Sequence, residues 1–490
     1  MVRALVARGA VAAAGPAARY LSDEDFPGLH VLERVERGGE AVLRLYPRGQ
    51  KASEPEEVPA AWGTLGEARE RLQAALRIPP REPYQNDWAM FDAQGRSADS
   101  LPGLAALDVV FVVELGVWIW PPVRVGFEHV AEGVDGDAPK VLRTLSLRPV
   151  IFEVSDFIQP SECEEVMRLG KMQGLTESKG VMQSADLKKG TAAKEFRTSK
   201  QAWLHNQQAG SVKRLDGRTA NLTRVPASHN EAVQVLRYDE GNYYHGHMDW
   251  AELELYRDQR ELWLSHHYGH NDRLATLFWY LNDVPDGGET IFLKHGQTIC
   301  PTYEQRNCPG APEPDMTSCS KGGLKVRPTR GTVILWYNYH PSGRGDRNAL
   351  HMGCPVGPGL VKWSGNKWIN IKPTDTPPAQ WVEDHPALRR MKYDGPKTEQ
   401  TTEYQCNIGF ANEGPEVVDV IWRNPDTGQS QKLLSLSRGE IKYLDTQRSH
   451  EFSVQQSSGD QKSKAVHCRQ SAGSYVVGAQ LEIAWRGEEL

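Results

Sequence analysis

Short hydrophobic runs bounded by Gly, Pro and polar residues dominate this chain, and they predict strands and loops rather than helical bundles. A capping box at Thr64–Glu67 predicts the start of a helix whose apolar residues share one face. With the strands around it, this helix indicates a small α/β domain over residues 25–125. The strands are expected at 41–46, 88–91 and 109–113.

A larger group of hydrophobic runs extends over residues 148–373 and contains two long polar insertions, 178–230 and 294–323. Many short strands with long excursions predict a jelly roll, a double-stranded β-helix whose interior can enclose a ligand. Insertions of this length are typical of lids and binding loops. A capping box at Ser161–Glu164 predicts a helix near the start. The strands are expected at 232–238, 274–281, 290–293, 324–326, 332–337 and 367–371.

Two segments are expected to separate the domains. Residues 126–147 contain the turn-forming run 133–139 and predict a linker, and residues 374–402, rich in Pro, Thr and charge, predict a tether. Residues 403–490 alternate between apolar and polar positions like a small β-sandwich. The expected fold class is therefore mixed α+β and all-β, with a central jelly roll flanked by an N-terminal α/β domain and a C-terminal β-sandwich.

The overall composition narrows the class of protein. The 490 residues carry 57 basic and 63 acidic side chains, a net charge of −6, which argues against general nucleic-acid binding. The longest apolar run, 109–120, is interrupted by Glu114 and is shorter than the ~20 residues that a membrane helix needs. Residues 1–22 contain three Arg and no acid, so they are expected to be a disordered or targeting tail. Three cysteines lie in one insertion, where a local disulfide is permitted: Cys300, Cys308 and Cys319.

Two histidines and one carboxylate form the strongest chemical signal. His247 and Asp249 are two residues apart, so on a strand they point to the same face while Met248 points away. His351 follows later in the chain. Two imidazoles and one carboxylate on one face of iron(II) leave its other positions open for a co-substrate and dioxygen. The three residues are therefore the candidate iron ligands and catalytic centre.

An iron oxygenase that uses 2-oxoglutarate also needs a buried cation, because the far carboxylate of this dianion must be held. Lys362, eleven residues after His351, is the candidate, and Lys367 is the alternative. Tyr238 and Thr290 are candidate hydroxyl donors to the same carboxylate.

The segments around these residues resemble the prolyl 4-hydroxylases in sequence, order and spacing. They are 234–238, 241–244, 247–249, 273–277, 280–283, 287–292 and 350–356. The resemblance implies that iron(II), 2-oxoglutarate and dioxygen are used to hydroxylate peptidyl proline, with release of succinate and carbon dioxide. It also implies that L-ascorbate restores over-oxidised iron.

This resemblance assigns roles residue by residue. It assigns iron to His247, Asp249 and His351. It assigns 2-oxoglutarate to Tyr238, Thr290 and Lys362. It places Tyr244, Arg273 and Trp368 in the peptide channel. Residues 197–199 correspond to a loop that folds over the substrate.

The chain departs from the family pattern at two places. The segment between His351 and Lys362 is one residue longer, and the insertion 294–323 is enlarged. The remaining histidines of the region are expected to be solvated or supporting rather than metal-binding: His245, His266, His267, His270 and His340.

The flanking domains show weaker resemblances. The order of strands and helix in residues 25–125 resembles a ubiquitin-like β-grasp, which implies no function. Residues 403–455 resemble the β-domain of the von Hippel–Lindau tumour suppressor, which implies a hydroxyproline pocket, and the alternative is a generic β-sandwich with core aromatic residues. The candidate pocket residues are Trp422, Thr446, His450 and Phe452, with Leu433 at the position of the pocket tyrosine.

The sequence thus predicts a peptidyl-proline 4-hydroxylase whose partner is a proline-containing peptide or protein. The alternatives are a hydroxylase of another side chain or small molecule, and a non-catalytic binding scaffold. The resemblance favours the endoplasmic-reticulum lumen, and residues 487–490 approach a retention signal; the cytoplasm is the alternative. Neither nucleic-acid binding nor a membrane-spanning segment is expected.

Overall fold

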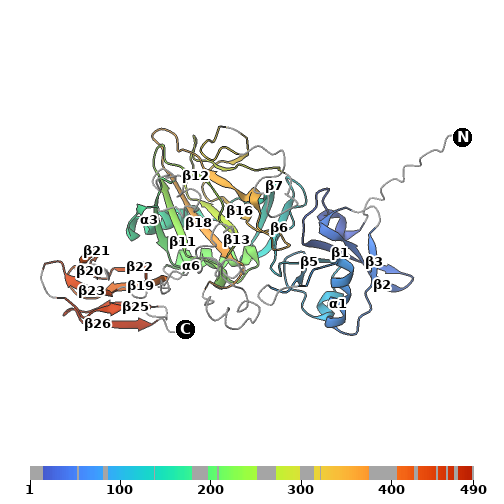
Figure 1. The fold of residues 1–490 in the computed structure, drawn as a ribbon, viewed down its shortest axis with the longest axis horizontal. Helices are drawn as coiled ribbons and strands as arrows, with labels where there is room; N and C mark the ends of the chain where they lie inside the picture. The colour runs from blue at the N-terminus through green and yellow to red at the C-terminus, as the bar shows by residue number, and fades with distance from the viewer. Residues whose placement is uncertain are drawn as a thin grey trace, which may run out of the picture. The chain divides into compact units, whose positions relative to one another are not determined.

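The structure is a computed structural model that divides into two compact units, residues 1–395 and 396–490 (Figure 1). The boundary falls within the predicted tether 374–402. Among the described residues, no helix is long and apolar enough to cross a membrane. The described residues are 15–51, 55–80, 86–136, 138–178, 197–206, 209–250, 272–297, 314–320, 322–374, 405–423, 429–447, 451–458, 462–467 and 473–487.

The first part of unit one is a sheet with two helices packed against it. Its elements are β1 (Leu29–Arg37), β2 (Glu40–Tyr46), β3 (Glu56–Pro59), α1 (Leu65–Leu76), β4 (Ala89–Phe91), α2 (Leu101–Ala105) and β5 (Val109–Val113). The strand order is β3-β2-β1-β5-β4. Thr64 caps α1, because its hydroxyl accepts a hydrogen bond from the Glu67 amide, as the sequence predicted. Leu32 of the sheet and Leu72 of α1 share the core between them.

The strand directions of this sheet differ from the predicted β-grasp. β5 pairs antiparallel with β1, with Leu29 opposite Val113 and Glu33 opposite Val109. A β-grasp instead pairs its first and last strands in parallel. The order of strands and helix along the chain matches the prediction, but the strand pairing does not. Pairing depends on contacts between distant segments, which the local pattern does not specify.

Two antiparallel sheets form the second part of unit one. Their strands are β6 (Glu128–Asp135), β7 (Ala138–Leu147), β8 (Val150–Val154), β9 (Thr176–Glu177), β10 (Lys200–Leu204), β11 (Val233–Tyr238), β12 (Tyr244–His247), β13 (Arg273–Tyr280), β14 (Thr290–Phe292), β15 (Leu324–Val326), β16 (Val333–Tyr337), β17 (His351–Gly353) and β18 (Lys362–Asn370). The large sheet has the order β6-β7-β8-β16-β13-β18-β11-β10-β9, and the small sheet has the order β12-β17-β14-β15. Leu236 and Tyr280 of the large sheet share one core with Phe292 of the small sheet. The two sheets therefore enclose an interior, as expected of the predicted jelly roll (Figure 1).

The predicted linker 126–147 is a hairpin in the structure. β6 and β7 pair with each other and extend the large sheet through β8. Gly133 lies near the end of β6 and Gly136 lies at the turn. Their φ angles are 63° and 61°, the left-handed conformation that Gly adopts readily. The prediction was wrong because the same turn-forming residues are typical of hairpin turns and of linkers.

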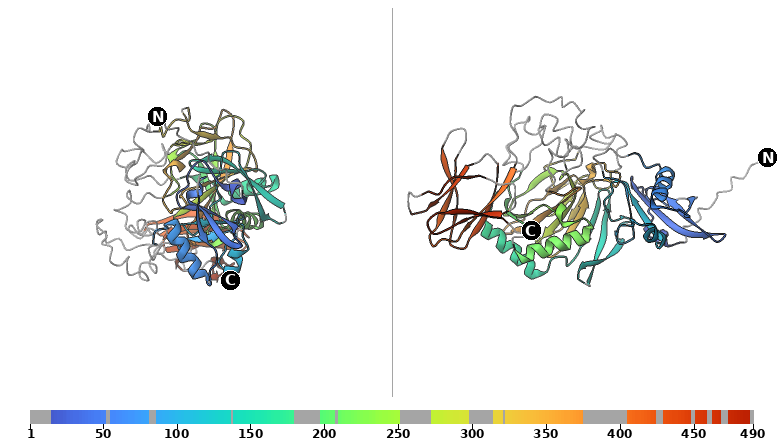
Figure 2. Two further views of the ribbon diagram at one scale, coloured as in Figure 1. Left: turned by 90° about the vertical axis from the view of Figure 1, so that its right-hand side faces the viewer. Right: turned by 90° about the horizontal axis from the view of Figure 1, so that it is seen from below.

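Two helices cover the outer face of the large sheet. They are α3 (Pro160–Gln173) and α6 (Gly210–Thr223), and Figure 2 shows both in shades of green along one side of the sheet. Val166 of α3 and Leu215 of α6 share a core with the outward side chains Leu277 and Trp279 of β13. The capping box of α3 is formed by the pair Gln159 and Glu162, two residues before the predicted pair.

The two parts of unit one share this outer core. Val31 and Phe111 lie in the same core as Leu277 of the large sheet. The backbone amide of Trp120 donates to the Tyr337 hydroxyl of β16 at 3.2 Å. Residues 25–125 are therefore built onto the barrel and do not form the separate domain that the sequence predicted.

Unit two is a β-sandwich, as predicted. Its strands are β19 (Gln405–Asn412), β20 (Val418–Arg423), β21 (Ser430–Leu436), β22 (Ile441–Gln447), β23 (Glu451–Gln456), β24 (Val466–His467), β25 (Gly473–Val477) and β26 (Ile483–Gly487). They form two sheets in the orders β22-β19-β25-β26 and β21-β20-β23-β24. Phe410, Val420 and Val454 pack in the core of this unit.

Candidate active site

The small sheet brings the three candidate iron ligands together. β12 ends at His247, Asp249 follows two residues later, and His351 is the first residue of β17. β12 and β17 are neighbours, with His247 directly opposite His351. One ligand atom from each side chain lies within 4.8 Å of the other two. His247 Nε2 is 3.7 Å from Asp249 Oδ1, and His351 Nε2 is 3.8 Å from Asp249 Oδ2.

Backbone carbonyls determine which nitrogen of each imidazole is left for a metal. His247 Nδ1 lies 2.9 Å from the His245 carbonyl oxygen, and His351 Nδ1 lies 2.8 Å from the Ala349 carbonyl oxygen. A carbonyl only accepts, so each Nδ1 carries a proton and Nε2 is the nitrogen that each ring can offer to a metal. Two neutral imidazoles and a carboxylate are the donor set of a mononuclear iron(II) site with open positions. The residues therefore fit iron(II).

The electrostatics of the site favour the protonation states that metal binding requires. Burial, followed by repulsion from His351, lowers the pKa of His247 to about 3. For Asp249, burial alone raises the pKa, but His351, His247 and Arg273 together lower it to about 2. At neutral pH His247 is therefore uncharged and Asp249 is ionised, as a metal needs of these ligands.

Side chains of the large sheet orient the Asp249 carboxylate. The Thr276 hydroxyl on β13 donates to Asp249 Oδ2 at 2.7 Å, and Asn338 Nδ2 donates to Thr276 Oγ1 at 3.2 Å. Trp336 Nε1 donates to Asn338 Oδ1 at 3.1 Å, and its ring centroid lies 4.7 Å from that of His351. Such contacts hold metal ligands in one orientation. These supporting residues were not predicted from the sequence. The signal that could have found them is a polar residue inside a buried strand.

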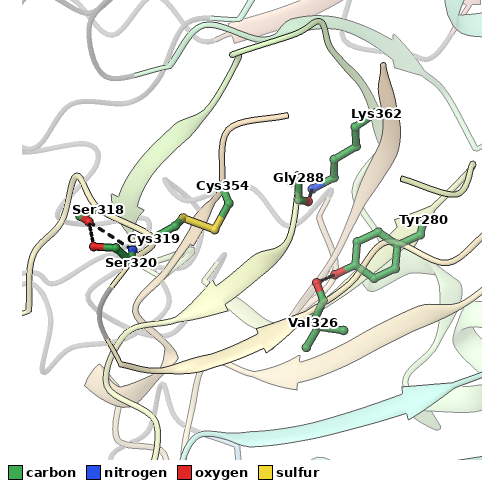
Figure 3. The surroundings of a disulfide bond; sticks show 8 residues. All are labelled: Tyr280, Gly288, Ser318, Cys319, Ser320, Val326, Cys354 and Lys362. Atoms are coloured by element: carbon green, nitrogen blue, oxygen red, sulfur yellow. Dashed lines mark hydrogen bonds between the residues drawn. A yellow bond between two sulfur atoms is a disulfide. The ribbon is translucent and has the colours of Figure 1, made fainter. Parts of the chain in front are cut away.

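Lys362, the candidate co-substrate anchor, lies inside the same barrel. It is 2% exposed, and its Nζ donates to the Gly288 carbonyl at 2.7 Å (Figure 3). Burial, offset in part by Glu289, lowers the pKa of Lys362 to about 7. Three aromatic rings surround the ammonium, with centroids 5.3, 5.2 and 5.6 Å away: Tyr238, Phe278 and Tyr280. An ammonium in this setting is suited to bind a carboxylate.

The two predicted hydroxyl donors lie close to Lys362. Tyr238 is 4% exposed and lies opposite Lys362 in the pairing of β11 with β18. Thr290 is 3% exposed, and its Oγ1 accepts a hydrogen bond from the Tyr280 hydroxyl at 2.9 Å. Because the Thr290 hydroxyl accepts from Tyr280, its own proton is left to donate. Tyr280 is a further polar group in this region that the sequence analysis did not single out.

Lys367, the predicted alternative anchor, lies on the opposite face of β18. An odd separation of five residues places it outside the barrel. Its Nζ donates to the Glu231 carbonyl at 2.6 Å and lies 2.7 Å from the Asp216 carboxylate on α6. This ammonium is therefore paired beneath a helix and does not face the interior where a co-substrate would bind.

Tyr244 and Arg197 form a stack on the candidate iron ligand His247. The Tyr244 ring lies 3.6 Å from the His247 ring in a stacked arrangement, and the Arg197 guanidinium lies 4.3 Å from the Tyr244 centroid. Arg197 is 5% exposed, and its Nε donates to Ser199 Oγ at 2.9 Å. Burial raises the pKa of Tyr244 to about 12, so its hydroxyl stays protonated. The predicted substrate loop therefore begins directly beside the ligand strand.

Arg273 and Trp368 form a second stack. The Arg273 guanidinium lies 3.6 Å from the Trp368 ring centroid and donates to both carboxylate oxygens of Glu231, at 2.8 and 3.0 Å. Trp368 lies opposite Thr276 in the pairing of β13 with β18. The centroid of Trp203 on β10 is 6.0 Å from that of Trp368. The structure thus gathers the predicted channel residues near the iron-ligand set and adds Arg197, Trp203 and Glu231 to them.

A disulfide fixes part of the long insertion beside the ligand strand. Cys319 is bonded to Cys354, and Figure 3 shows this bond. Three residues before Cys319, the Met316 carbonyl accepts from the amide of Gly246, which precedes His247, at 2.9 Å. Cys319 therefore pairs outside the insertion, whereas the sequence allowed a bond within it. The other two cysteines of the insertion, Cys300 and Cys308, lie outside the described residues.

The other histidines take the supporting positions that were expected where the structure describes them. His245 contributes its carbonyl to the site, and its ring stacks on Tyr243 with centroids 4.5 Å apart. His340 Nε2 lies 3.6 Å from Asp346 Oδ1. The remaining three, His266, His267 and His270, lie outside the described residues.

The predicted hydroxyproline pocket of unit two is only partly described. Phe452 is 1% exposed and packs against Phe410 with centroids 5.9 Å apart, so it belongs to the core rather than to a binding surface. Trp422 lies opposite Phe452 across β20 and β23 and is partly buried against the same core. Leu433 is 41% exposed. His450 and the side chain of Thr446 lie outside the described part of the chain.

Comparison with known proteins places this geometry in a family. The chain matches the 2OG-Fe(II) oxygenase superfamily over residues 233–370. It is 30% identical to probable prolyl 4-hydroxylase 6 of Arabidopsis thaliana over 280 residues, covering 56% of this chain and 88% of that protein. It is 32% identical to probable prolyl 4-hydroxylase 7 of the same organism over 238 residues, covering 48% and 67%. With mouse transmembrane prolyl 4-hydroxylase it shares 26% identity over 369 residues, covering 55% and 72%.

Solved structures give a more distant similarity. The viral collagen prolyl hydroxylase vCPH from Paramecium Bursaria Chlorella virus-1 has 22% sequence identity and a TM-score of 0.29, covering 45% of this chain and 94% of that one. The sequence relatives show the family, because the first of them is 30% identical and is matched over 88% of its length. The chain therefore belongs to the prolyl 4-hydroxylases of the 2OG-Fe(II) oxygenase superfamily.

Proposed function

We propose that this chain is a peptidyl-proline 4-hydroxylase that uses iron(II), 2-oxoglutarate and dioxygen. The observation that carries the proposal is a single barrel that combines the His247, Asp249 and His351 set with the buried Lys362 ammonium. The name prolyl 4-hydroxylase, given to its relatives, supports proline as the oxidised residue. Iron(II), 2-oxoglutarate and dioxygen are the reagents of this superfamily, and L-ascorbate is a typical reductant for it.

Three side chains would hold iron(II) through the two Nε2 atoms and the Asp249 carboxylate. Bound iron(II) supplies the oxidising chemistry that couples decarboxylation of 2-oxoglutarate to hydroxylation of a C–H bond. The protein contributes orientation. The backbone carbonyls of His245 and Ala349 hold the two imidazoles in one tautomer, and Thr276 holds the carboxylate.

Lys362 would bind the far carboxylate of 2-oxoglutarate, with Tyr238 and Thr290 as hydroxyl donors. An ammonium has three donors, and the Gly288 carbonyl takes one of them. An anion beside Lys362 favours its charged form, so binding of 2-oxoglutarate would raise its pKa above the value near 7 that burial produces.

The substrate would reach the metal past Tyr244, Arg273 and Trp368. Aromatic surfaces recognise proline-rich segments in extended polyproline form, because the rigid peptide loses little entropy on binding. The stacks of Tyr244 on His247 and of Arg273 on Trp368 provide such surfaces close to the ligand set.

The test is a hydroxylation assay on an array of proline-containing peptides with iron(II), 2-oxoglutarate and ascorbate. We expect a gain of one oxygen on proline, identified as 4-hydroxyproline by amino-acid analysis, with one succinate formed per hydroxylation. Oxygen gained on another residue would favour the alternative of a different side-chain hydroxylase. A chain that neither binds iron(II) nor forms succinate would be a scaffold.

For the C-terminal sandwich, hydroxyproline binding stays a prediction. Core burial of Phe452 removes one of its four proposed contacts, which favours the generic sandwich. The wild-type chain and its Trp422→Ala variant are each titrated with a hydroxyprolyl peptide and with its prolyl counterpart. This distinguishes a hydroxyproline reader from a generic sandwich. Equal affinity for both peptides in every sample would remove the reader hypothesis.

A further inference from the structure

Three amide side chains form a hydrogen-bonded row across neighbouring strands of the large sheet. Gln234 Nε2 on β11 donates to Gln201 Oε1 on β10 at 2.6 Å. Asn366 Nδ2 on β18 donates to Gln234 Oε1 at 2.9 Å. Gln234 and Asn366 are 4% and 7% exposed, while Gln201 is half-buried and ends the row.

Arg197 determines the direction of every bond in this row. A guanidinium only donates, and Arg197 Nη2 lies 3.4 Å from Gln234 Oε1, so this oxygen is an acceptor. Gln234 Nε2 must then be the donor to Gln201, whose Oε1 accepts. Among the described residues the Nε2 group of Gln201 has no hydrogen-bond partner, so it ends the row and can only donate.

The row connects the ligand set with the predicted peptide channel. Arg197 lies over Tyr244, and Tyr244 stacks on the iron ligand His247. At the other end, Gln201 shares one side of β10 with Trp203, since the two are two residues apart. Trp203 in turn lies 6.0 Å from Trp368, measured between ring centroids. Gln201 therefore lies on the same side of the sheet as the channel aromatics.

The backbone of a proline-rich peptide calls for such a donor. Each proline keeps its carbonyl but lacks an N–H group, so the peptide offers mainly acceptors. A wall that presents an N–H donor of fixed direction therefore matches this backbone better than a wall that presents an oxygen.

We propose that Gln201 is a specificity residue of this enzyme, whose Nε2 donates to a backbone carbonyl of the prolyl peptide. The inference rests on the proposed function. It makes Gln234, Asn366 and Arg197 positioning residues that hold the Gln201 amide in one orientation.

The test compares Gln201→Glu and Gln201→Met with the wild-type chain on the best peptide of the hydroxylation assay. Gln201→Glu keeps the oxygen that Gln234 needs but loses the donor. We expect the ratio of KM for peptide to KM for 2-oxoglutarate to rise roughly fivefold, as for one neutral hydrogen bond. The matched control is Gln73→Glu, because Gln73 is a half-buried glutamine on α1 outside the barrel, and its ratio should stay at the wild-type value.

A thioamide scan of the peptide identifies the carbonyl. Sulfur accepts hydrogen bonds weakly, so one thioamide position should raise the wild-type KM and leave that of Gln201→Met unchanged. A ratio within twofold of wild type for both Gln201 variants would overturn the inference while proline hydroxylation itself stands. If the wild-type chain forms succinate but hydroxylates no prolyl peptide, the proposed function fails and the inference fails with it.

Discussion

The inner and outer faces of the large sheet give a buried lysine different partners. On β18, Lys362 points into the barrel and donates to a carbonyl, while Lys367 points outward and pairs with the Asp216 carboxylate. Burial lowers the pKa of both ammonium groups, and for Lys367 Asp216 partly offsets this effect. Burying an ammonium without a carboxylate partner lowers the stability of the fold. Where the ammonium is paired, removing it leaves the buried carboxylate unpaired and destabilises the protein.

On this one sheet, the inward side chains line the candidate site and the outward side chains pack in the core. On β13, the inward Thr276 donates to the ligand Asp249, while its outward neighbour Leu277 packs in the core with the covering helices. Alternation along a strand makes this separation possible, because successive side chains point to opposite faces. Inward substitutions should therefore change ligand binding, and outward substitutions should change the free energy of unfolding.

The largest effect is expected at the candidate iron ligands inside the barrel. His247→Ala removes one of three ligands, so iron-dependent formation of succinate should fall to background. The control is His245→Ala, two residues away, which keeps the backbone carbonyl that His247 uses and should retain turnover. Succinate measured by mass spectrometry, with iron content of the purified chain, checks both variants. Full turnover by His247→Ala would show that the ligand assignment is wrong.

The two lysines give the sharpest form of the comparison. Lys362→Met should raise the KM for 2-oxoglutarate by roughly 10- to 100-fold, the value of a hydrogen bond to a charged group, with the melting temperature unchanged or higher. Lys367→Met should lower the free energy of unfolding by about 3–5 kcal/mol, because Asp216 loses its partner, with little change in this KM. Steady-state kinetics and denaturant unfolding measure the two quantities. The comparison is wrong if Lys362→Met lowers the free energy of unfolding and Lys367→Met raises the KM for 2-oxoglutarate.

Neighbouring residues on β13 extend the comparison to uncharged side chains. Thr276→Val should weaken iron(II) binding by about tenfold, as loss of a contact to a metal ligand does. Leu277→Ala should instead cost about 2–5 kcal/mol of unfolding free energy through the cavity that it leaves. Metal titration followed by calorimetry and denaturant unfolding distinguish the two. A Thr276→Val chain that binds iron(II) like wild type would remove the proposed role of its hydroxyl.

The last prediction is a pH dependence of co-substrate binding. Burial lowers the pKa of Lys362 to about 7, and in the proposed function its charged form would bind the anion. Below pH 7 the group is already charged and affinity should be constant, whereas above pH 7 affinity should fall by about tenfold per pH unit. Calorimetry in buffers of different ionisation enthalpy should show uptake of a proton near pH 8. Lys362→Met should lose the dependence, and an equally steep fall in that variant would assign it to another group.

Much of the site was predictable because its chemistry depends on residue types at short spacing. His247 and Asp249 share a face at any strand position. His351 and Lys362 were candidates by residue type and place in the chain, and the family resemblance assigned them the same roles. The choice between Lys362 and Lys367 was open, because either the even-numbered or the odd-numbered residues of β18 could point into the barrel. The pairing of Tyr238 opposite Lys362 decides it. Thr276 was missed because only its contact with Asp249 distinguishes it from other polar residues in strands.

By itself, the sequence determined the strand-rich class, the order of the elements and the set of candidate metal-binding side chains. These are local properties, read from alternation, turn residues and short motifs. Only the tertiary structure decided that residues 126–147 extend the sheet, that β5 runs antiparallel to β1, and that Cys319 is bonded to Cys354. The reason is physical: each depends on pairing between segments whose contacts form only when the whole core packs.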